Sequence, residues 1–474
     1  MTDPTGSVIF FRPFFTKRQA VPAPPMCCLC LYSDKIFLFF SKNLIFFSKL
    51  WYNSIYFYIF QKNQEFLYKM NTEKKIIPVL LGADLNCYSV ARAFHEAYGV
   101  KSYAFGRYAL GTTKYSRIVK FHIVEDVDTK EVLLPTLEAF AKEHTDALLI
   151  LIGCTDAYAD LIIENKDVLS EYYFCACPRA DLAEQLISKE AFYEMCVKYG
   201  MDFPKTVIVK NNEETVKLDS LPFPYPIILK PSSSIRYWQN PFDGMKKVYK
   251  VDTPEEAKKI AETIFASGYD DSLIIQDFIP GDDSRMYVLT AYCNQNAKVK
   301  MMCLGHVLLE EHTPKGIGNH VAILTEYHEE LLRTVKAFLE SVGYTGFANF
   351  DIKYDVRDGK FKIFEINLRQ GRSNFYVTHS GANLAKLFVG DATGTLPEET
   401  AYMQTPMFWH TVPKKIIYSY IKDEETMQTV KTLVKEKKSA SSLFYAYDLN
   451  MNPLRLAYVT IHNRRYFKKY KMYP

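Results

Sequence analysis

The chain has 474 residues, 48% of them hydrophobic, and a formal net charge of +4. This length and apolar content are enough for two or three domains around a large core. So weak a net charge gives no indication of a nucleic-acid partner, and we expect none.

Residues 1–69 do not resemble the rest of the chain, because their central stretch is dominated by Phe, Ile, Tyr, Leu, Asn and Lys. Lys35, Lys42 and Lys49 interrupt it, so no run reaches the ~18 apolar residues that a membrane helix needs. The segment also lacks the basic, apolar and small-residue regions of a signal peptide. We expect a non-native or disordered extension, with the working protein starting at Met70; a membrane anchor is the alternative.

The ten cysteines indicate no metal site, because the single CxxC spacing, Cys27 to Cys30, has no second pair to complete it. We expect buried free thiols in a reducing cytoplasm for Cys87, Cys154, Cys196 and Cys303.

Residues 70–180 predict a small α/β domain with a parallel sheet. Ile76–Leu81, Lys101–Phe105 and Ala147–Ile152 are strand candidates, and a helical pattern follows the first of them through Tyr98. There is no GxGxxG, so a dinucleotide site is unsupported. Ligands can lie at the carboxyl ends of such strands, near residues 82–86 and 153–156, although plain scaffold is the commoner role of such loops.

A second unit starts near Arg179. Ser188 opens a helix that closes at Gly200, and a strand starts at Thr206. Another buried strand delivers Lys230 directly before a serine-rich loop, whose Ser232 and Ser233 hydroxyls and turn amides can bond phosphate oxygens. A surface lysine beside a polar turn is the alternative. A further buried strand ends at residues 276–279 and precedes a glycine turn with Asp282 and Asp283.

Residues 347–374 predict a hairpin around a three-residue loop, Arg357–Gly359. Val356 then pairs with Lys360, Asp351 lies opposite Glu365, and Asn349 lies opposite Asn367. One face collects Phe350, Ile352, Phe364, Ile366 and Leu368; the other collects Asn349, Asp351, Glu365, Asn367 and Arg369. The carboxylate and amide oxygens of Asp351, Glu365 and Asn367 suit Mg²⁺, whereas an ordinary solvent-facing hairpin is the alternative.

The chain resembles the ATP-grasp superfamily in the order of four motifs. They are the helix-start lysine, the strand–Lys–Pro–Ser loop, the strand with QDFIPGDD and the final D-x13-E-x-N. The likeness covers about residues 73–474 and is greatest to its carboxylate–amine ligases, the group that includes bacterial D-aspartate ligase. It implies an α/β pre-ATP-grasp domain over 70–180 and α+β ATP-grasp lobes over 181–398 that hold ATP between them. Residues 399–474 then form a small basic C-terminal segment.

The resemblance also assigns roles to single residues. It implies that Lys189 and Lys230 meet the nucleotide phosphates, that residues 276–279 form the hinge that reads adenine (Gln276, Asp277, Phe278, Ile279), and that Asp283 accepts the ribose hydroxyls. Asp351, Glu365 and Asn367 match ligands of two magnesium ions, for which Mn²⁺ can substitute. Several relatives carry an arginine where this chain has Asn349, so the catalytic arginine is left open between Arg369 and Arg372, with Lys230 also absorbing charge.

The implied reaction is ATP-dependent. A substrate carboxylate attacks the γ-phosphate to give an acylphosphate and ADP, and an amine then displaces phosphate. An amino acid and a cell-wall (peptidoglycan) precursor are the substrates that the resemblance suggests. A catalytically inactive ATP-binding regulatory or scaffold module is the alternative, and acyl transfer to a non-amine acceptor is a third possibility.

Three further segments have open roles. Residues 314–319 (PKGIGN) are a candidate for closing the pocket or touching substrate, and a plain hairpin turn fits them equally. The spacing of His306, His312, His320 and His328 fits no zinc pattern, so we expect ordinary core or surface groups. The basic C-terminus favours a solvated helix face over contact with anionic envelope precursors or a membrane; its cations are Arg464, Arg465, Lys468, Lys469 and Lys471.

Overall fold

The computed structural model describes residues 75–314 and 316–474. The expectations for residues 1–69, for a start at Met70 and for Cys27 and Cys30 lie outside this range. Within it, no helix combines the length and the apolar character needed to cross a membrane.

The first part of the described chain is a five-stranded parallel sheet of order β3-β2-β1-β4-β5. Its strands are β1 (Lys75–Leu81), β2 (Ser102–Gly106), β3 (Val119–Ile123), β4 (Ala147–Gly153) and β5 (Phe174–Cys175). Its helices are α3 (Leu85–Tyr98), α4 (Gly111–Lys114), α5 (Lys130–Lys142), α6 (Asp156–Glu164) and α7 (Lys166–Leu169). The predicted parallel α/β architecture and its three predicted strands are confirmed.

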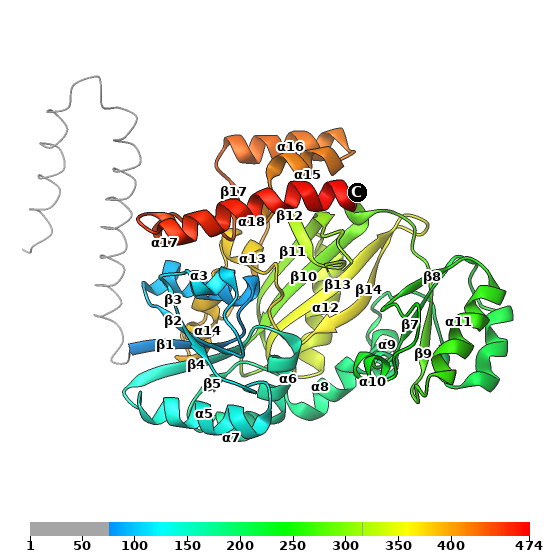
Figure 1. The fold of residues 1–474 in the computed structure, drawn as a ribbon, viewed down its shortest axis with the longest axis horizontal. Helices are drawn as coiled ribbons and strands as arrows, with labels where there is room; N and C mark the ends of the chain where they lie inside the picture. Colours follow the sequence, from blue (N-terminus) through cyan, green and yellow to red (C-terminus); the bar gives the residue numbers. More distant parts are fainter. Residues whose placement is uncertain (1–74, 315) are drawn as a thin grey trace, which may run out of the picture. The chain divides into compact units, whose positions relative to one another are not determined.

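Helices cover both faces of this sheet, because alternate side chains of β1 point to opposite sides. Ile77, Val79 and Leu81 share a hydrophobic cluster with side chains of α5, whereas Ile76 and Leu80 share another with side chains of α3. Figure 1 shows α3 on one side of the strands and α5 on the other. A strand buried on both faces reads as a continuous apolar run, which is why β1 and β4 were visible in the sequence.

The second sheet has four antiparallel strands in the order β6-β9-β7-β8. Its strands are β6 (Thr206–Val209), β7 (Ile227–Pro231), β8 (Tyr249–Val251) and β9 (Leu273–Asp277). The helices around it are α8 (Ala180–Ile187), α9 (Lys189–Tyr199), the 3₁₀ helix η2 (Asn212–Asp219), α10 (Ser234–Gln239) and α11 (Pro254–Ala266). The predicted ends of α9 are confirmed: the Ser188 hydroxyl caps its start, and Gly200 closes it at φ 68°.

The third sheet is the largest, with eight strands. Seven run in the order β14-β13-β10-β11-β12-β16-β17, and β15 pairs with β11. They are β10 (Met286–Cys293), β11 (Val299–Glu310), β12 (His320–Glu326), β13 (Gly346–Asp355), β14 (Lys360–Asn367), β15 (Ala401–Tyr402), β16 (Phe408–His410) and β17 (Ser439–Ser441). The helices α12 (Glu329–Ser341), α13 (Phe375–His379) and α14 (Leu384–Ala392) and the 3₁₀ helix η3 (Asp283–Arg285) accompany them.

The C-terminal residues add β15, β16 and β17 to the large sheet and form four helices, two of them between β16 and β17. These are α15 (Lys414–Tyr420), α16 (Glu424–Lys435), α17 (Ala446–Leu449) and α18 (Pro453–Met472). The Arg455 side chain of α18 and the Asp448 carboxylate of α17 are fully buried and lie 3.2 Å apart. The Asp448 carboxylate also accepts a hydrogen bond from the Tyr88 hydroxyl of α3, so this end of the chain is tied to the first domain.

Candidate active site

The hairpin of β13 and β14 has the predicted register where the acidic residues lie. Asp351 is paired with Glu365, and Asn349 is paired with Asn367. Four of the five residues predicted for the apolar face are buried in one hydrophobic cluster: Phe350, Ile352, Ile366 and Leu368. The need to bury these side chains fixes the register, because a shift of one residue would expose all of them.

The turn of the hairpin differs from the prediction. Asp355, not Val356, pairs with Lys360, so the loop has four residues. The Asp355 carboxylate accepts hydrogen bonds from the backbone N–H and the side chain of Arg357, which closes the turn one residue earlier. Gly359 does take the expected left-handed conformation, at φ 72°.

A bulge at Phe364 then restores the predicted register, because Ile352 pairs with Ile363 while Asp351 pairs with Glu365. The placement of Phe364 on the apolar face was therefore wrong. Ile363 takes its place in the core at 1% exposure. The Lys230 ammonium lies 5.9 Å from the centre of the Phe364 ring.

Two carboxylates and an amide meet on the polar face of the hairpin. The Asn367 amide nitrogen donates to Asp351 Oδ2 at 3.2 Å, and Glu365 is the cross-strand neighbour of Asp351. Burial, followed by the charge of Glu365, raises the pKa of Asp351. The Lys189 ammonium, 2.9 Å from Glu365 Oε2, holds the pKa of Glu365 below its ordinary value. A buried carboxylate crowded by a second one favours a cation beside it, so this donor set fits Mg²⁺.

Two lysines from distant parts of the chain lie beside Glu365. Lys189 opens α9 and Lys230 comes from β7. Burial, and then the neighbouring charge of Lys189, lowers the pKa of Lys230 to about 7. Lys247 contributes to lowering the pKa of both Lys230 and Glu365, so it lies near the same group. The sequence prediction missed Lys247, although it belongs to the basic run at 246–250.

The serine-rich loop follows Lys230 directly. The Ser232 backbone N–H donates to the Ser272 carbonyl, and the Ser233 hydroxyl accepts a hydrogen bond from the Arg236 backbone N–H at the start of α10. These bonds join the loop to the residue before β9 and to the start of α10.

The residues predicted for the hinge have their side chains engaged by protein groups. The Gln276 amide donates to the Tyr193 and Thr206 hydroxyls at 2.8 and 3.0 Å. Ile279 is buried at 3% exposure. Both Asp277 oxygens accept hydrogen bonds from Arg357, at 3.0 and 2.7 Å.

The β13–β14 hairpin makes a second contact with the segment predicted to be the hinge, through Lys353 of β13. Its ammonium donates to the Gly281 carbonyl at 3.0 Å and lies 5.5 Å from the centre of the Phe278 ring. Lys250 of β8 lies 4.7 Å from the centre of the same ring. The loop and the strand of one hairpin thus fix the segment from Asp277 to Gly281.

Asp283 and the four histidines take part in local hydrogen bonds. Asp283 Oδ2 accepts from the Glu310 backbone N–H and contacts His312 Nε2, both at 2.9 Å. His306 pairs with Glu326 at 2.7 Å, His320 with Glu310 at 3.4 Å, and His328 caps α12. In the described chain no three His, Cys, Asp or Glu side chains gather as a metal cluster.

The arginines beyond β14 connect the large sheet to the first domain. Arg369 Nε lies 2.8 Å from Asp156 Oδ1, at the start of α6. Asn86 donates to the Gln370 carbonyl, and the Gln370 amide donates to the Gly153 carbonyl. The two loops that the sequence marked as possible ligand positions therefore meet the Arg369–Arg372 segment.

Asp84 and Asn349 complete this junction. Burial raises the pKa of Asp84, and the charges of Arg372 and Arg369 partly oppose that rise. Asn349 is buried and its side chain accepts a hydrogen bond from the Thr290 hydroxyl at 2.9 Å. Sequence reasoning did not identify Asp84 or Asp156 as site residues, because their approach to the arginines depends on how the first domain packs.

The PKGIGN segment connects β11 and β12 of an antiparallel pair, as a hairpin turn does. The Glu311 backbone N–H donates to the Asn319 carbonyl at 2.9 Å across its base. The Glu311 carboxylate binds Lys469 of α18 at 2.7 Å and lies 4.0 Å from Arg372 Nη1. A role in closing the pocket remains a prediction.

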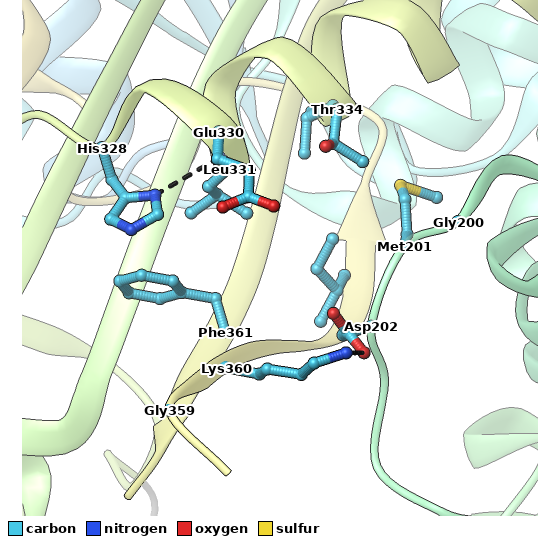
Figure 2. A pocket seen from close by; sticks show the side chains of 12 residues that line it. Gly200, Met201, Asp202, His328, Glu330, Leu331, Thr334, Gly359, Lys360 and Phe361 are labelled. Carbon is cyan, nitrogen blue, oxygen red and sulfur yellow. Dashed lines mark hydrogen bonds and ion pairs between the residues drawn. The ribbon is translucent and has the colours of Figure 1, made fainter.

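Two cavities in the described chain lie away from the residues predicted to bind ATP and magnesium. One of about 220 Å³ is lined by α12 and the turn region of the hairpin, and Figure 2 shows Lys360 beside Asp202 and His328 at the start of α12. Another of about 520 Å³ is lined by residues from α3, β16, β17 and α18. None of the predicted site residues lines either one.

No family model matches the chain. A sequence relative decides its family: the chain is 42% identical over 412 residues to D-aspartate ligase of Enterococcus faecium (strain Aus0004), covering 84% of this chain and 97% of that protein. The chain belongs to the D-aspartate ligase family. It is therefore an ATP-dependent carboxylate–amine ligase that uses ATP with Mg²⁺ and acts on small-molecule carboxylate and amine substrates.

Solved structures of ATP-grasp enzymes share the fold of this D-aspartate ligase family member. The biotin carboxylase domain of Hydrogenobacter thermophilus 2-oxoglutarate carboxylase, solved with MgADP, superposes with a TM-score of 0.52 at 14% identity, covering 68% of this chain and 71% of that one. N5-carboxyaminoimidazole synthetase from Staphylococcus aureus, solved with ADP, gives 0.51 at 13% identity, covering 71% and 83%. The predicted fold class and ligase activity are confirmed, and the inactive-module alternative is not supported.

Proposed function

We propose that this ligase activates a carboxylate of D-aspartate and joins it to an amine of a cell-wall (peptidoglycan) precursor in the cytoplasm. The name of the Enterococcus relative supports the choice of acid. The observation that carries the catalytic part is the meeting of Asp351 and Glu365 with Lys189 and Lys230, which come from three separate stretches of the chain.

Asp351, Glu365 and Asn367 would hold the magnesium, with Glu365 shared between two ions and Mn²⁺ able to substitute. When bound, the metal neutralises the phosphate oxygens and polarises the γ-phosphate. The raised pKa of Asp351 supports this assignment, because a cation would relieve the crowding of the two carboxylates.

For the nucleotide, we assign the phosphates to Lys189, Lys230 and the loop of Ser232 and Ser233, and the ribose hydroxyls to Asp283. Adenine would bind to the main chain of residues 276–279, since the Gln276 and Asp277 side chains already bind protein groups. Phosphoryl transfer requires positioning and charge neutralisation more than a protein nucleophile, and these residues supply both.

In the reaction, a carboxylate oxygen attacks the γ-phosphorus and the bond to ADP breaks. The amine nitrogen then attacks the acyl carbon, and phosphate leaves. Arg369, Arg372 and Lys230 stabilise the charge that develops, and the arginines bind substrate carboxylate. The loops of the first domain, anchored through Asp156 and Asn86, exclude water from the acylphosphate.

We assign the pre-ATP-grasp domain to residues 70–180, the ATP-grasp lobes to 181–398 and a C-terminal segment to 399–474. Packing supports treating the last as a cap on the large sheet, because β16 pairs with β12 and α18 contacts the β11–β12 turn.

The test is ADP release with matched acids and a lysine-containing peptide as the amine. D-Aspartate should trigger ADP release. Two matched acids should trigger at most about a hundredth as much: D-asparagine, which lacks the side-chain carboxylate, and L-aspartate, the mirror image. Either acid would leave polar groups of the site unpaired. Equal release with L-aspartate or D-asparagine would contradict the proposed acid. Loss of release when hydroxyl acceptors replace the peptide would support the amine.

A further inference from the structure

The last helix has two faces of different character. The inner face is buried: Tyr470 donates from its hydroxyl to the Glu310 carbonyl, and Lys469 binds Glu311. Because Glu311 also lies 4.0 Å from Arg372 Nη1, α18 lies directly over the segment that carries the candidate catalytic arginines. Figure 1 shows the C-terminal end of α18, in red, near the end of the large sheet.

The outer face of α18 is cationic. The helix has six Lys and Arg residues and no Asp or Glu in its 20 residues. Four of these cations are exposed: Arg464, Arg465, Lys468 and Lys471. A surface that needed only to be solvated would gain from mixed charges, whereas exposed cations with no acidic residue on the same helix favour an anionic partner.

Large apolar side chains are exposed on the same helix, one near its start and three around these cations. Leu454 is 66% exposed, Ile461 52%, Phe467 47% and Met472 58%. Leu454, Ile461 and Lys468 recur at intervals of seven residues, which places them in one row along the helix. The cations of the outer face are thus flanked by apolar side chains that no part of the described chain covers.

We propose that the outer face of α18 docks on an anionic membrane surface. Cations that meet lipid headgroups, together with Leu, Ile, Phe and Met side chains that enter the acyl boundary, are the two components of interfacial helix binding. The phosphate backbone of a nucleic acid would satisfy the cations but would leave the four apolar side chains in water, so the lipid surface fits better. Docking would bring the candidate arginines within about one helix diameter, ~10 Å, of the lipid surface.

The experiment measures binding of the full chain to vesicles of phosphatidylcholine alone or with phosphatidylglycerol, by co-sedimentation. We expect binding only with phosphatidylglycerol, weakened by salt. In a variant with the four exposed cations of α18 changed to Gln, vesicle binding should fall on the order of 100-fold. These cations are Arg464, Arg465, Lys468 and Lys471. The matched control changes four exposed lysines on other elements to Gln and keeps wild-type binding; these are Lys130, Lys259, Lys298 and Lys386.

A second experiment reports on the apolar side chains of α18 alone, because its fluorescent probe lies on that helix. In a Phe467→Trp variant, the added tryptophan fluorescence, taken as the difference from the unchanged protein, should shift to the blue with phosphatidylglycerol vesicles. No shift, or equal binding by the four-cation variant and the wild type, would overturn the proposal. Binding of polyuridylate in place of vesicles would overturn it too, in favour of a nucleic-acid partner.

Discussion

Replacing Lys230 by Met is expected to stabilise the nucleotide-free enzyme while it abolishes nucleotide binding. The Lys230 ammonium is largely removed from water, and its nearest charges include the like charge of Lys189, so its pKa falls from 10.5 to about 7. At about 1.4 kcal/mol per pH unit, this corresponds to at most about 5 kcal/mol of destabilisation when the group is charged. Since water still reaches part of the side chain, we expect a gain of about 2 kcal/mol for Lys230→Met at pH 6.

The pH dependence has a definite sign. Because the unfolded chain holds this proton more tightly than the folded protein, the free energy of unfolding of the wild type should rise between about pH 7 and pH 10. Below pH 7 both states are protonated, so the full penalty remains. The Lys230→Met variant should lack this rise.

Urea unfolding at pH 6 and pH 9, with and without ATP and Mg²⁺, measures both effects. The wild type should gain stability from the nucleotide, whereas Lys230→Met should not. An exposed control, Lys259→Met, should leave both the pH dependence and the nucleotide effect unchanged. A variant less stable than the wild type at pH 6, or one that ATP still stabilises, would refute the reasoning.

Two other substitutions separate positioning from packing. Arg357→Ala removes the two hydrogen bonds that hold Asp277 in the segment predicted to be the hinge. The KM for ATP should rise about tenfold while kcat stays within about threefold, because a bidentate, partly exposed pair contributes on the order of 1 kcal/mol. An unchanged KM in steady-state assays, or the same rise in the exposed control Arg333→Ala, would show that this contact does not position the nucleotide. Arg455→Ala leaves the buried Asp448 charge without its partner, so the free energy of unfolding should fall by about 3 kcal/mol; a loss below about 1 kcal/mol in urea unfolding would contradict this.

The sequence was sufficient where local patterns and burial agreed. The alternation of apolar residues around Asp351 and Glu365 fixed which residues face each other, because the wrong register would bury a carboxylate among hydrophobic side chains. The same reasoning missed the bulge at Phe364 and the four-residue turn. The turn is closed by hydrogen bonds between Asp355 and Arg357 that the pattern of apolar residues does not contain, and the bulge offsets the resulting change of register.

Long-range features were beyond reach for a different reason. Asp84 and Asp156 lie near Arg369 and Arg372 only because the first domain packs against the large sheet. Likewise, β3 is mostly exposed and β5 has two residues, so neither has the continuous apolar run that made β1 and β4 visible. The order of motifs indicated the family, but the contacts between domains required the structure.

The most direct test of the magnesium site is ADP release by Glu365→Ala, with D-aspartate, an amine acceptor, ATP and Mg²⁺ present. Removing one carboxylate of the Asp351 and Glu365 pair should lower ADP release at least about a thousandfold. The substitution removes a proposed ligand of the magnesium ions and also the ion-pair partner of Lys189. Circular dichroism should remain that of the wild type, and the control Glu340→Ala on α12 should keep full activity. Retention of most of the activity by a folded Glu365→Ala variant would contradict the assignment of this hairpin as the catalytic metal site.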